Sequence, residues 1–399
     1  MSPFVLDGAR LWIGDGTVRD GHVVVADGRI DLVGSGPYAG PLETLDLSGL
    51  ALSPGLIDLM LLGGFDLSIC RDDQLDIARH YLRLGVTSIQ VCFGTLQWDA
   101  MNQVAENTRR AQAYRGTDAA RVIGLYPEGP FQQPDLTGGS ASRYALPPTR
   151  QNVRRILDEL GSAVTMVNVS PSTEGDAEAV RAFREAGRVV TMAHSNAPAD
   201  RVRTCVEAGT TVLGHSWDNN SGLLGDSGVQ QPTLEHVSLT DERVRSLHLI
   251  SDGAHVHPIL IRMMLRCRGI ESICLVTDCN QKSGCEDGPF FWDDGREFYK
   301  EGGVCRVKET DGLAGSATLL PDDWRNFVKF SGLEPRAAIR AVTYNPAASL
   351  GLDNDIGLIA PGRAADLLTW GSDLKVGRVW RDGAEVANVS DFAEVSMDK

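Results

Sequence analysis

Apolar, β-rich runs alternate with amphipathic stretches through the middle of the chain. The apolar runs contain few polar positions, which is typical of strands that are covered on both faces. The amphipathic stretches between them have helical spacing, and several end at a glycine. This alternation predicts an α/β protein, with eight strands expected at 55–61, 86–92, 121–127, 163–169, 188–193, 210–214, 246–251 and 272–277. The expected helices are QLDIARHYLRLG, TRQNVRRILDELG, DAEAVRAFREAG, PADRVRTCVEAG and PILIRMMLRC.

Eight strands that alternate with helices favour a (β/α)₈ barrel. The alternative is a doubly wound open sheet, but no GxGxxG motif follows the first strand. Two further helices are expected in PDDWRNFVKFSG and PRAAIRAVTYNPAASLG. Residues 280–312 are polar, aromatic and rich in glycine, and we expect them to form an excursion over one barrel face or a small hairpin. Both chain ends have short strand patterns separated by turn residues, so we expect them to form one sheet structure together.

Composition and charge narrow the possible partners. The 399 residues include 38 Lys and Arg against 53 Asp and Glu, a formal charge of -15. This excess argues against nucleic acid and against an anionic membrane surface, although a local pocket can still be basic. The chain has neither a run of 18 apolar residues nor a leader pattern at its start, so we expect a cytoplasmic protein. Its eight cysteines form no CxxC pair, and we expect buried free thiols.

Acidic residues and histidines follow five of the expected strands. In a (β/α)₈ barrel the carboxyl ends of the strands meet at one mouth, so these side chains are expected to converge. A lone histidine at a strand end is more often a structural hydrogen-bonding group, but the set as a whole indicates a metal site. The residues are Glu128, His194, His215, Asp252 with His255, and Asp278.

One carboxylate and two imidazoles are three protein ligands, which leaves a fourth position open for water. That is the pattern of a catalytic zinc site, where the metal lowers the pKa of its water toward about 7. Asp278 would then take the proton of the water and pass it to a leaving amine, and His255 would hydrogen-bond the substrate.

The segments that carry these residues resemble the N-acetylglucosamine-6-phosphate deacetylases of the amidohydrolase superfamily. The matching motifs occur in the family's order over nearly the whole chain. They are LSPGLIDL, YPEGPF, AHSNAP, GHSWDN, SDGAHV, LVTDC, DGLAGSATLL and GLIAPGRAADLL.

The resemblance implies a hydrolytic deacetylase that acts on an N-acetyl amino sugar. It implies a barrel over residues 53–354 and a small β-sandwich made of residues 1–52 and 355–399. One divalent metal ion, expected to be Zn²⁺, would be held by Glu128, His194 and His215, and Asp278 would act as general base and then general acid. Such enzymes are often homodimers. The implied substrate contacts are His255, Asp218, Asn219, Asp226, Leu313, Ala314 and Gly315.

Several positions depart from the family pattern. Many amidohydrolases carry HxH after the first strand, where this chain has Met60 and Leu62, so one metal ion is expected rather than two. The family segment H-x-x-N-A-M is followed by an arginine that binds substrate phosphate. Here the segment is HSWDNNSGLLGDSG, and Asp226 stands where the arginine would be. A Gly-x-His motif that often follows the glutamate is replaced by GGSASRYA.

These departures leave open whether the sugar carries a 6-phosphate, because a carboxylate repels phosphate. Arg143 or Lys282 could supply a replacement charge. Two other functions remain open. One is a different amidohydrolase reaction, such as hydrolysis of a cyclic amide or deamination of a heterocycle. The other is non-catalytic sugar binding on a decayed enzyme fold.

Overall fold

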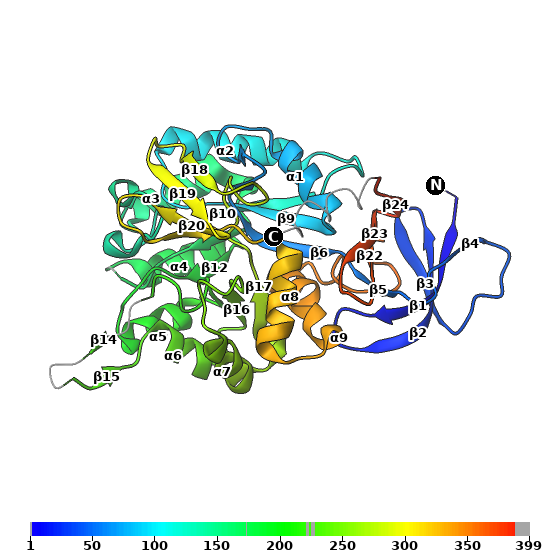
Figure 1. Ribbon diagram of the computed structural model, residues 1–399. Coiled ribbons are helices and arrows are strands. Elements are labelled where there is room, and N and C mark those ends of the chain that lie inside the picture. The colour runs from blue at the N-terminus through cyan, green and yellow to red at the C-terminus, as the bar shows by residue number, and fades with distance from the viewer. Residues whose placement is uncertain (1, 173, 221–222, 225–227, 388–399) are drawn as a thin grey trace.

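The computed structural model describes residues 2–172, 174–220, 223–224 and 228–387. Helices surround one group of strands in the larger part of the molecule, and a separate sheet lies at one end (Figure 1). No helix among these residues is both long and apolar enough to cross a membrane. All eight cysteines are free thiols, and five of them are buried, which confirms the expectation for most of them.

Eight parallel strands form a closed barrel. Neighbouring strands pair in parallel within a three-stranded and a five-stranded segment. Bridges between Leu125 and Val164 and between Leu61 and Cys279 join the two segments on both sides. This closure confirms the predicted barrel and excludes the open sheet. The strands are β6 (Leu56–Leu61), β9 (Val86–Phe93), β10 (Arg121–Pro127), β11 (Met166–Asn168), β12 (Val189–Met192), β13 (Val212–Leu213), β16 (Ser246–Leu249) and β17 (Ile273–Leu275).

Helices cover the outside of the barrel. All of the predicted helices are present, although the second, TRQNVRRILDELG, continues as a π-helix at Ile156–Leu160 and the last breaks into short pieces. Two helices that the apolar spacing did not predict also occur, α2 and α6. The helices are α1 (Gln74–Arg83), α2 (Trp98–Gln112), α3 (Arg150–Arg155), α4 (Asp176–Glu185), α5 (Ala199–Ala208), α6 (Leu234–Thr240), α7 (Pro258–Arg268), α8 (Leu320–Ser331), α9 (Pro335–Ala338) and α10 (Tyr344–Ser349).

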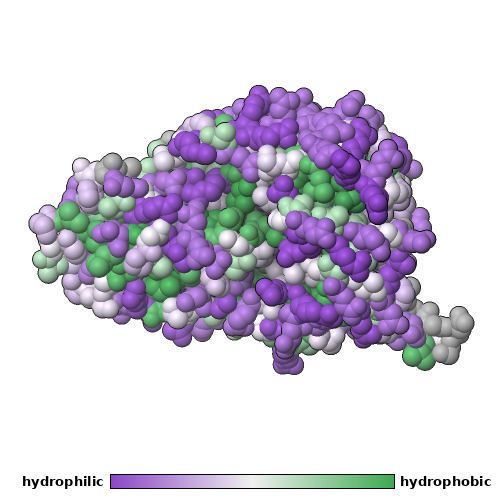
Figure 2. All heavy atoms as spheres, turned by 180° about the vertical axis from the view of Figure 1, so that it is seen from behind, coloured by the Kyte–Doolittle hydropathy of each residue, from purple (hydrophilic) through white to green (hydrophobic). Residues whose placement is uncertain are grey.

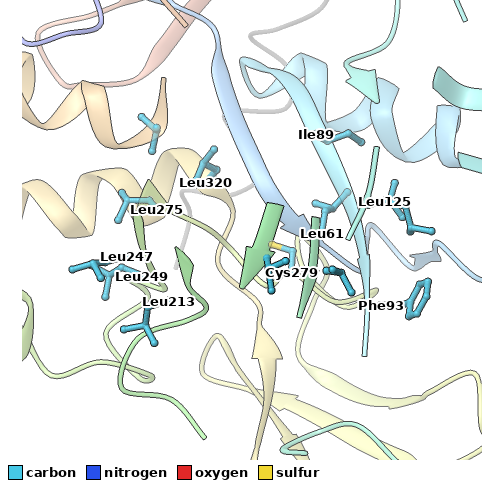
Figure 3. Close-up of a cluster of buried hydrophobic side chains, with 14 of the residues drawn as sticks. Leu61, Ile89, Phe93, Leu125, Leu213, Leu247, Leu249, Leu275, Cys279 and Leu320 are labelled. Carbon is cyan, nitrogen blue, oxygen red and sulfur yellow. The ribbon is translucent and has the colours of Figure 1, made fainter. Parts of the chain in front are cut away.

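The strands are apolar on both faces because each face has its own core. Side chains that point outward pack against the helices, and Figure 3 shows Leu61, Leu125, Leu249 and Leu275 in that cluster. Side chains that point inward fill the barrel interior; among them is Met60. This double burial explains why the strands are nearly continuous apolar runs in the sequence.

The two chain ends meet in one eight-stranded sheet, as their strand patterns predict. Its order is β24-β23-β22-β5-β1-β2-β3, with β4 paired to β1, and it encloses its own apolar cluster. The strands are β1 (Phe4–Trp12), β2 (Val18–Ala26), β3 (Arg29–Ser35), β4 (Glu43–Asp46), β5 (Ala51–Pro54), β22 (Leu367–Trp370), β23 (Val376–Arg381) and β24 (Ala384–Glu385).

Seen from behind, the surface is mostly hydrophilic over the barrel. Hydrophobic atoms gather on the lobe of the small sheet and between the two lobes (Figure 2). Leu32 of β3 is among the large apolar residues that are exposed.

A four-stranded antiparallel sheet follows the last barrel strand, which confirms the hairpin expected within 280–312. It consists of β18 (Gly288–Phe291), β19 (Glu297–Glu301), β20 (Val304–Val307) and β21 (Leu313–Ser316). Two shorter antiparallel pairs join β7 (Gly63–Gly64) with β8 (Leu67–Ser68) and β14 (Leu223–Leu224) with β15 (Gln230–Gln231).

Candidate metal centre

Three side chains that follow barrel strands meet at the barrel mouth. Glu128 comes directly after β10, His194 follows β12 and His215 follows β13. Their ligand atoms all lie within 4.8 Å of one another, and all three residues are buried. Glu128 Oε1 is 3.0 Å from His194 Nε2 and 2.6 Å from His215 Nε2. The barrel therefore brings together the three expected metal ligands among the residues that the strand-end pattern indicated.

The donor set fits a divalent metal ion. His194 Nδ1 donates to the carbonyl oxygen of Leu136 at 2.6 Å, so Nε2 is the ring nitrogen that faces Glu128 and His215. The Nε2 atoms of the two histidines are only 3.0 Å apart. A divalent cation bound between these two nitrogens and the carboxylate would take the place of the protons on the nitrogens, and one carboxylate with two imidazoles is a common ligand set for zinc.

The histidines reverse the effect of burial on Glu128. Burial alone would raise the pKa of this carboxyl, but the charge of His194 and hydrogen bonds from both histidines hold it well below its usual range. For His215, burial would lower the pKa, whereas the Glu128 carboxylate raises it to about 10. The two histidines therefore keep Glu128 ionised.

Asp278 stands beside this centre, just past β17. Its backbone is left-handed, with φ 53°, and Ser316 N–H donates to its carbonyl oxygen at 2.9 Å. A Cβ at Gly315 would lie 2.6 Å from the same carbonyl oxygen, so this close approach requires glycine. Burial, and then the charge of Glu128, raise the pKa of Asp278 well above its usual range. A buried carboxyl with a raised pKa is suited to hold and release a proton.

The buried carboxyl group of Asp58 holds the strand end before Asp278 in place. Asp58 on β6 accepts a hydrogen bond from the Thr277 hydroxyl at 2.5 Å and another from Met60 N–H at 3.2 Å. Asp278 N–H donates to the carbonyl oxygen of Met60 at 3.0 Å. The first and last barrel strands are therefore tied together directly beneath Asp278.

Most of the residues expected to contact substrate line the same pocket. Asp218, Asn219, Leu313, Ala314 and Gly315 lie around Glu128, His194, His215 and Asp278. His255 is buried against Asp252, with 2.6 Å between its Nδ1 and Asp252 Oδ2, and it is not among the residues that line this pocket in the described chain. Asp226 lies outside the described residues.

The structure adds lining residues that the sequence analysis did not assign. Thr137, Gly139 and Ser140 come from the loop after Glu128, and Trp292 comes from the hairpin sheet. Trp292 also lines an adjoining pocket that shares Leu62 and Ser140 with this one, so the hairpin forms part of the wall between them. The space beside the metal ligands has a volume of about 30 Å³, and it opens to solvent.

Met60 and Leu62 stand where many amidohydrolases carry the HxH pair, and neither side chain offers an ordinary zinc ligand. Met60 is buried in the barrel interior, and Leu62 forms part of the pocket wall. The two candidate replacement cations are engaged elsewhere. Arg143 pairs with Asp294 at 3.4 Å, and Lys282 pairs with Asp66 at 3.2 Å.

Comparisons with known proteins agree with this geometry. Residues 106–386 match the model of the amidohydrolase family. An N-acetylgalactosamine-6-phosphate deacetylase from Escherichia coli is 30% identical over 387 residues, covering 95% of this chain and 98% of the relative. An N-acetylglucosamine-6-phosphate deacetylase from Vibrio furnissii is 26% identical, covering 86% of this chain and 84% of the relative.

A solved structure is similar over nearly the full length. It is a mutant N-acetyl-D-glucosamine-6-phosphate deacetylase from Mycobacterium smegmatis in complex with N-acetyl-D-glucosamine-6-phosphate. The TM-score is 0.87 at 27% identity, covering 97% of this chain and 100% of the other. Both its barrel and its β-sandwich therefore have counterparts here.

Proposed function

Because the chain belongs to the amidohydrolase family, we propose that it removes the acetyl group from an N-acetyl amino sugar by metal-assisted hydrolysis. The chain is a hydrolase of carbon–nitrogen amide bonds. The observation that carries the proposal is the convergence of Glu128, His194 and His215 beside Asp278. The relatives named as amino sugar phosphate deacetylases support this substrate class.

Glu128, His194 and His215 would hold one divalent ion, for which zinc is the expected identity. Such an ion supplies Lewis-acid polarisation of the amide carbonyl and lowers the pKa of water. Met60 and Leu62 offer no ligand for a second ion in the ordinary coordination chemistry of zinc, so one ion is proposed.

Asp278 would move the proton. As the general base it accepts a proton from the attacking water, and as the general acid it delivers that proton to the nitrogen of the departing amine. The carbon–nitrogen bond then breaks, giving acetate and the free amino sugar. Asp218, Asn219 and the strand segment Leu313–Gly315 would orient the sugar, and His255 is proposed to act with them.

Acetate release and bound metal, measured together on the zinc-loaded protein, test this proposal. We expect Glu128→Gln to lose both the metal and activity, because it removes the carboxylate that joins the two histidines. The control Glu207→Gln, on the exposed surface of α5, should retain both. A wild-type protein that binds metal but releases no acetate from any N-acetyl amino sugar would contradict the proposal.

The alternative activities make different predictions for the same protein. A hydrolase of cyclic amides would open a ring without releasing acetate, and a deaminase would release ammonia. A non-catalytic sugar-binding protein would bind sugar with and without Asp278 and release nothing. The homodimer and the cytoplasmic location stay predictions.

A further inference from the structure

Trp292 stands between the space beside the candidate metal ligands and a second hollow. It lies in the turn between β18 and β19 and lines both spaces, and so do Ser140 and Leu62, the residue that follows β6. Polar groups that hold the hairpin turn line part of the second hollow. The apolar side chains in its lining include Ile69, Phe93 and Leu96. Removal of the indole ring would therefore join the metal pocket to a space with an apolar wall.

The turn that carries Trp292 is held in place by several contacts. Trp292 N–H donates to the carbonyl oxygen of Arg296 at 2.9 Å. The indole packs against the ring of Phe298, which is fully buried, with 4.9 Å between the ring centroids. Asp293, the next residue, accepts a hydrogen bond from Ser68 Oγ at 2.6 Å. The indole is therefore a fixed part of the pocket wall.

The polar and apolar parts of the pocket lining suit the two parts of an N-acyl amino sugar. Asp218 and Asn219 offer hydrogen-bonding groups, which suit the hydroxyls of the sugar. Leu62 and Trp292 offer hydrocarbon and aromatic surface, which suits the alkyl part of the acyl group. Leu62 also lies close to the proposed proton carrier Asp278, because its N–H donates at 2.8 Å to the carbonyl oxygen of the following residue, Cys279.

We infer that Trp292, together with Leu62, is a specificity-determining residue that limits the length of the acyl group, so that the site accepts acetyl and rejects longer chains. This inference rests on the proposed deacetylase function. A longer acyl chain on the reacting amide would need the space that the indole occupies, and the fixed turn resists displacement of the ring. The limit applies equally to the sugar phosphates for which the relatives are named, because it concerns the acyl group alone.

The experiment compares kcat/KM for glucosamine-6-phosphate and galactosamine-6-phosphate that carry an N-acetyl, N-propionyl or N-butyryl group, using the zinc-loaded full chain. Release of the free amino sugar is measured, because this product is common to all three acyl forms. We expect acetyl to be preferred over propionyl by at least about tenfold, since one methylene group in an apolar pocket changes kcat/KM by roughly 10-fold to 200-fold. Equal values for all three acyl groups would overturn the inference and leave the hydrolase proposal intact.

Trp292→Ala and Leu62→Ala test the wall at two different elements. Each should raise kcat/KM for butyryl relative to acetyl by about tenfold or more, because each opens the metal pocket toward the second hollow. Phe291→Ala is the matched control and should keep the ratio of the wild type, because Phe291 is the neighbour of Trp292 but is 58% exposed. An unchanged ratio in Trp292→Ala would overturn the inference. If that variant does not fold, the ratio in Leu62→Ala decides.

Binding gives a readout that does not depend on turnover. In zinc-loaded Asp278→Asn, calorimetry should show that the N-butyryl sugar phosphate binds at least about tenfold more weakly than the N-acetyl form. Adding Trp292→Ala to this variant should reduce the difference, and an unchanged difference would contradict the role of the indole. If the wild type releases no amino sugar from any of these substrates, the proposed function fails and the inference fails with it.

Discussion

Two buried carboxyls at the barrel mouth have pKa values shifted in opposite directions. Glu128 is held ionised by two histidines, whereas burial and the neighbouring Glu128 charge raise the pKa of Asp278. When the pKa values of two neighbouring carboxyls are shifted apart in this way, the two groups can perform different tasks. Glu128 suits a permanent ligand, and Asp278 suits a group that gains and loses a proton.

The first prediction concerns Asp278→Asn. Its amide keeps the size of the side chain but cannot accept and return a proton, so kcat should fall by roughly 10² to 10⁴. Because Asp278 is not among the proposed ligands, the metal content should stay near that of the wild type. Acetate release and metal analysis of the purified variant check both points. A variant with wild-type turnover would show that another group moves the proton.

The second prediction concerns Asp58 and pH. Burial raises the pKa of this carboxyl from 3.8 to about 6 despite its hydrogen bonds. Between pH 3.8 and about pH 6, Asp58 holds a proton in the folded chain that it has lost in the unfolded chain. The free energy of unfolding therefore falls as pH rises through this range. The loss approaches 3 kcal/mol, or about 1.4 kcal/mol for each pH unit. The stability of the wild type relative to Asp58→Asn should therefore decrease from pH 4 to pH 7.

Thermal unfolding midpoints of both proteins, measured across this pH range, check the second prediction. Asp200→Asn, which removes an exposed carboxylate, should show no such pH-dependent difference from the wild type. A constant difference between the wild type and Asp58→Asn would contradict the raised pKa.

The strand-end residues could be predicted from the sequence, and family motifs indicated Asp218, Asn219 and Leu313–Gly315, but the contribution of the hairpin to the pocket could not be predicted. Glu128, His194, His215 and Asp278 each follow an apolar run, and barrel topology brings such positions together. Trp292 lies on a hairpin distant in sequence, and no local pattern indicates which way that hairpin folds. Its place in the pocket depends on long-range packing alone.

At the scale of elements, strands with both faces buried were the most predictable. A continuous apolar run needs partners on two sides, and a barrel provides them. Helix α2 was missed because its sequence, WDAMNQVAENTRRAQ, is mostly polar and has only a narrow apolar stripe. Helix α6 is only seven residues long. Short or polar helices owe their stability to tertiary contacts that the sequence alone does not reveal.

The third prediction concerns the hairpin sheet. Trp292, in the turn between strands β18 and β19, lines the pocket beside the metal ligands, so a bound sugar would contact this hairpin. Ser68 Oγ donates to Asp293 Oδ2 at 2.6 Å and helps to hold the hairpin against β8. We expect amide hydrogen exchange in residues 288–301 to be faster than in the barrel strands, and to slow when sugar binds.

Hydrogen exchange measured on Asp278→Asn with saturating N-acetyl amino sugar checks this prediction, because the variant should bind sugar without consuming it. Residues 246–249, in barrel strand β16, provide the internal control and should not change. Equal exchange in residues 288–301 with and without bound sugar would show that the hairpin does not respond to substrate.

At the scale of the whole molecule, the small sheet is joined to the barrel by aromatic packing. Trp12 of β1 and Trp370 of β22 lie 6.3 Å apart between ring centroids, and Trp324 of helix α8 is 4.5 Å from Trp370. Trp370 Nε1 also donates to Ser53 Oγ at 2.9 Å. All three rings are buried in the cluster that contains the barrel's outer core. The two units therefore share part of one core.

This shared core leads to the fourth prediction. We propose that the boundaries between the units lie near residues 52–53 and 354–355, but that the units unfold together. Trp370→Ala should lower stability by about 3–5 kcal/mol and should speed hydrogen exchange both in residues 4–26 of the small sheet and in residues 246–249 of the barrel. Trp98→Ala is the matched control, because Trp98 lies on α2 beneath Arg155 and away from the junction. Faster exchange confined to the small sheet would contradict this prediction, because it would mean that the barrel is stable without the packing at Trp370.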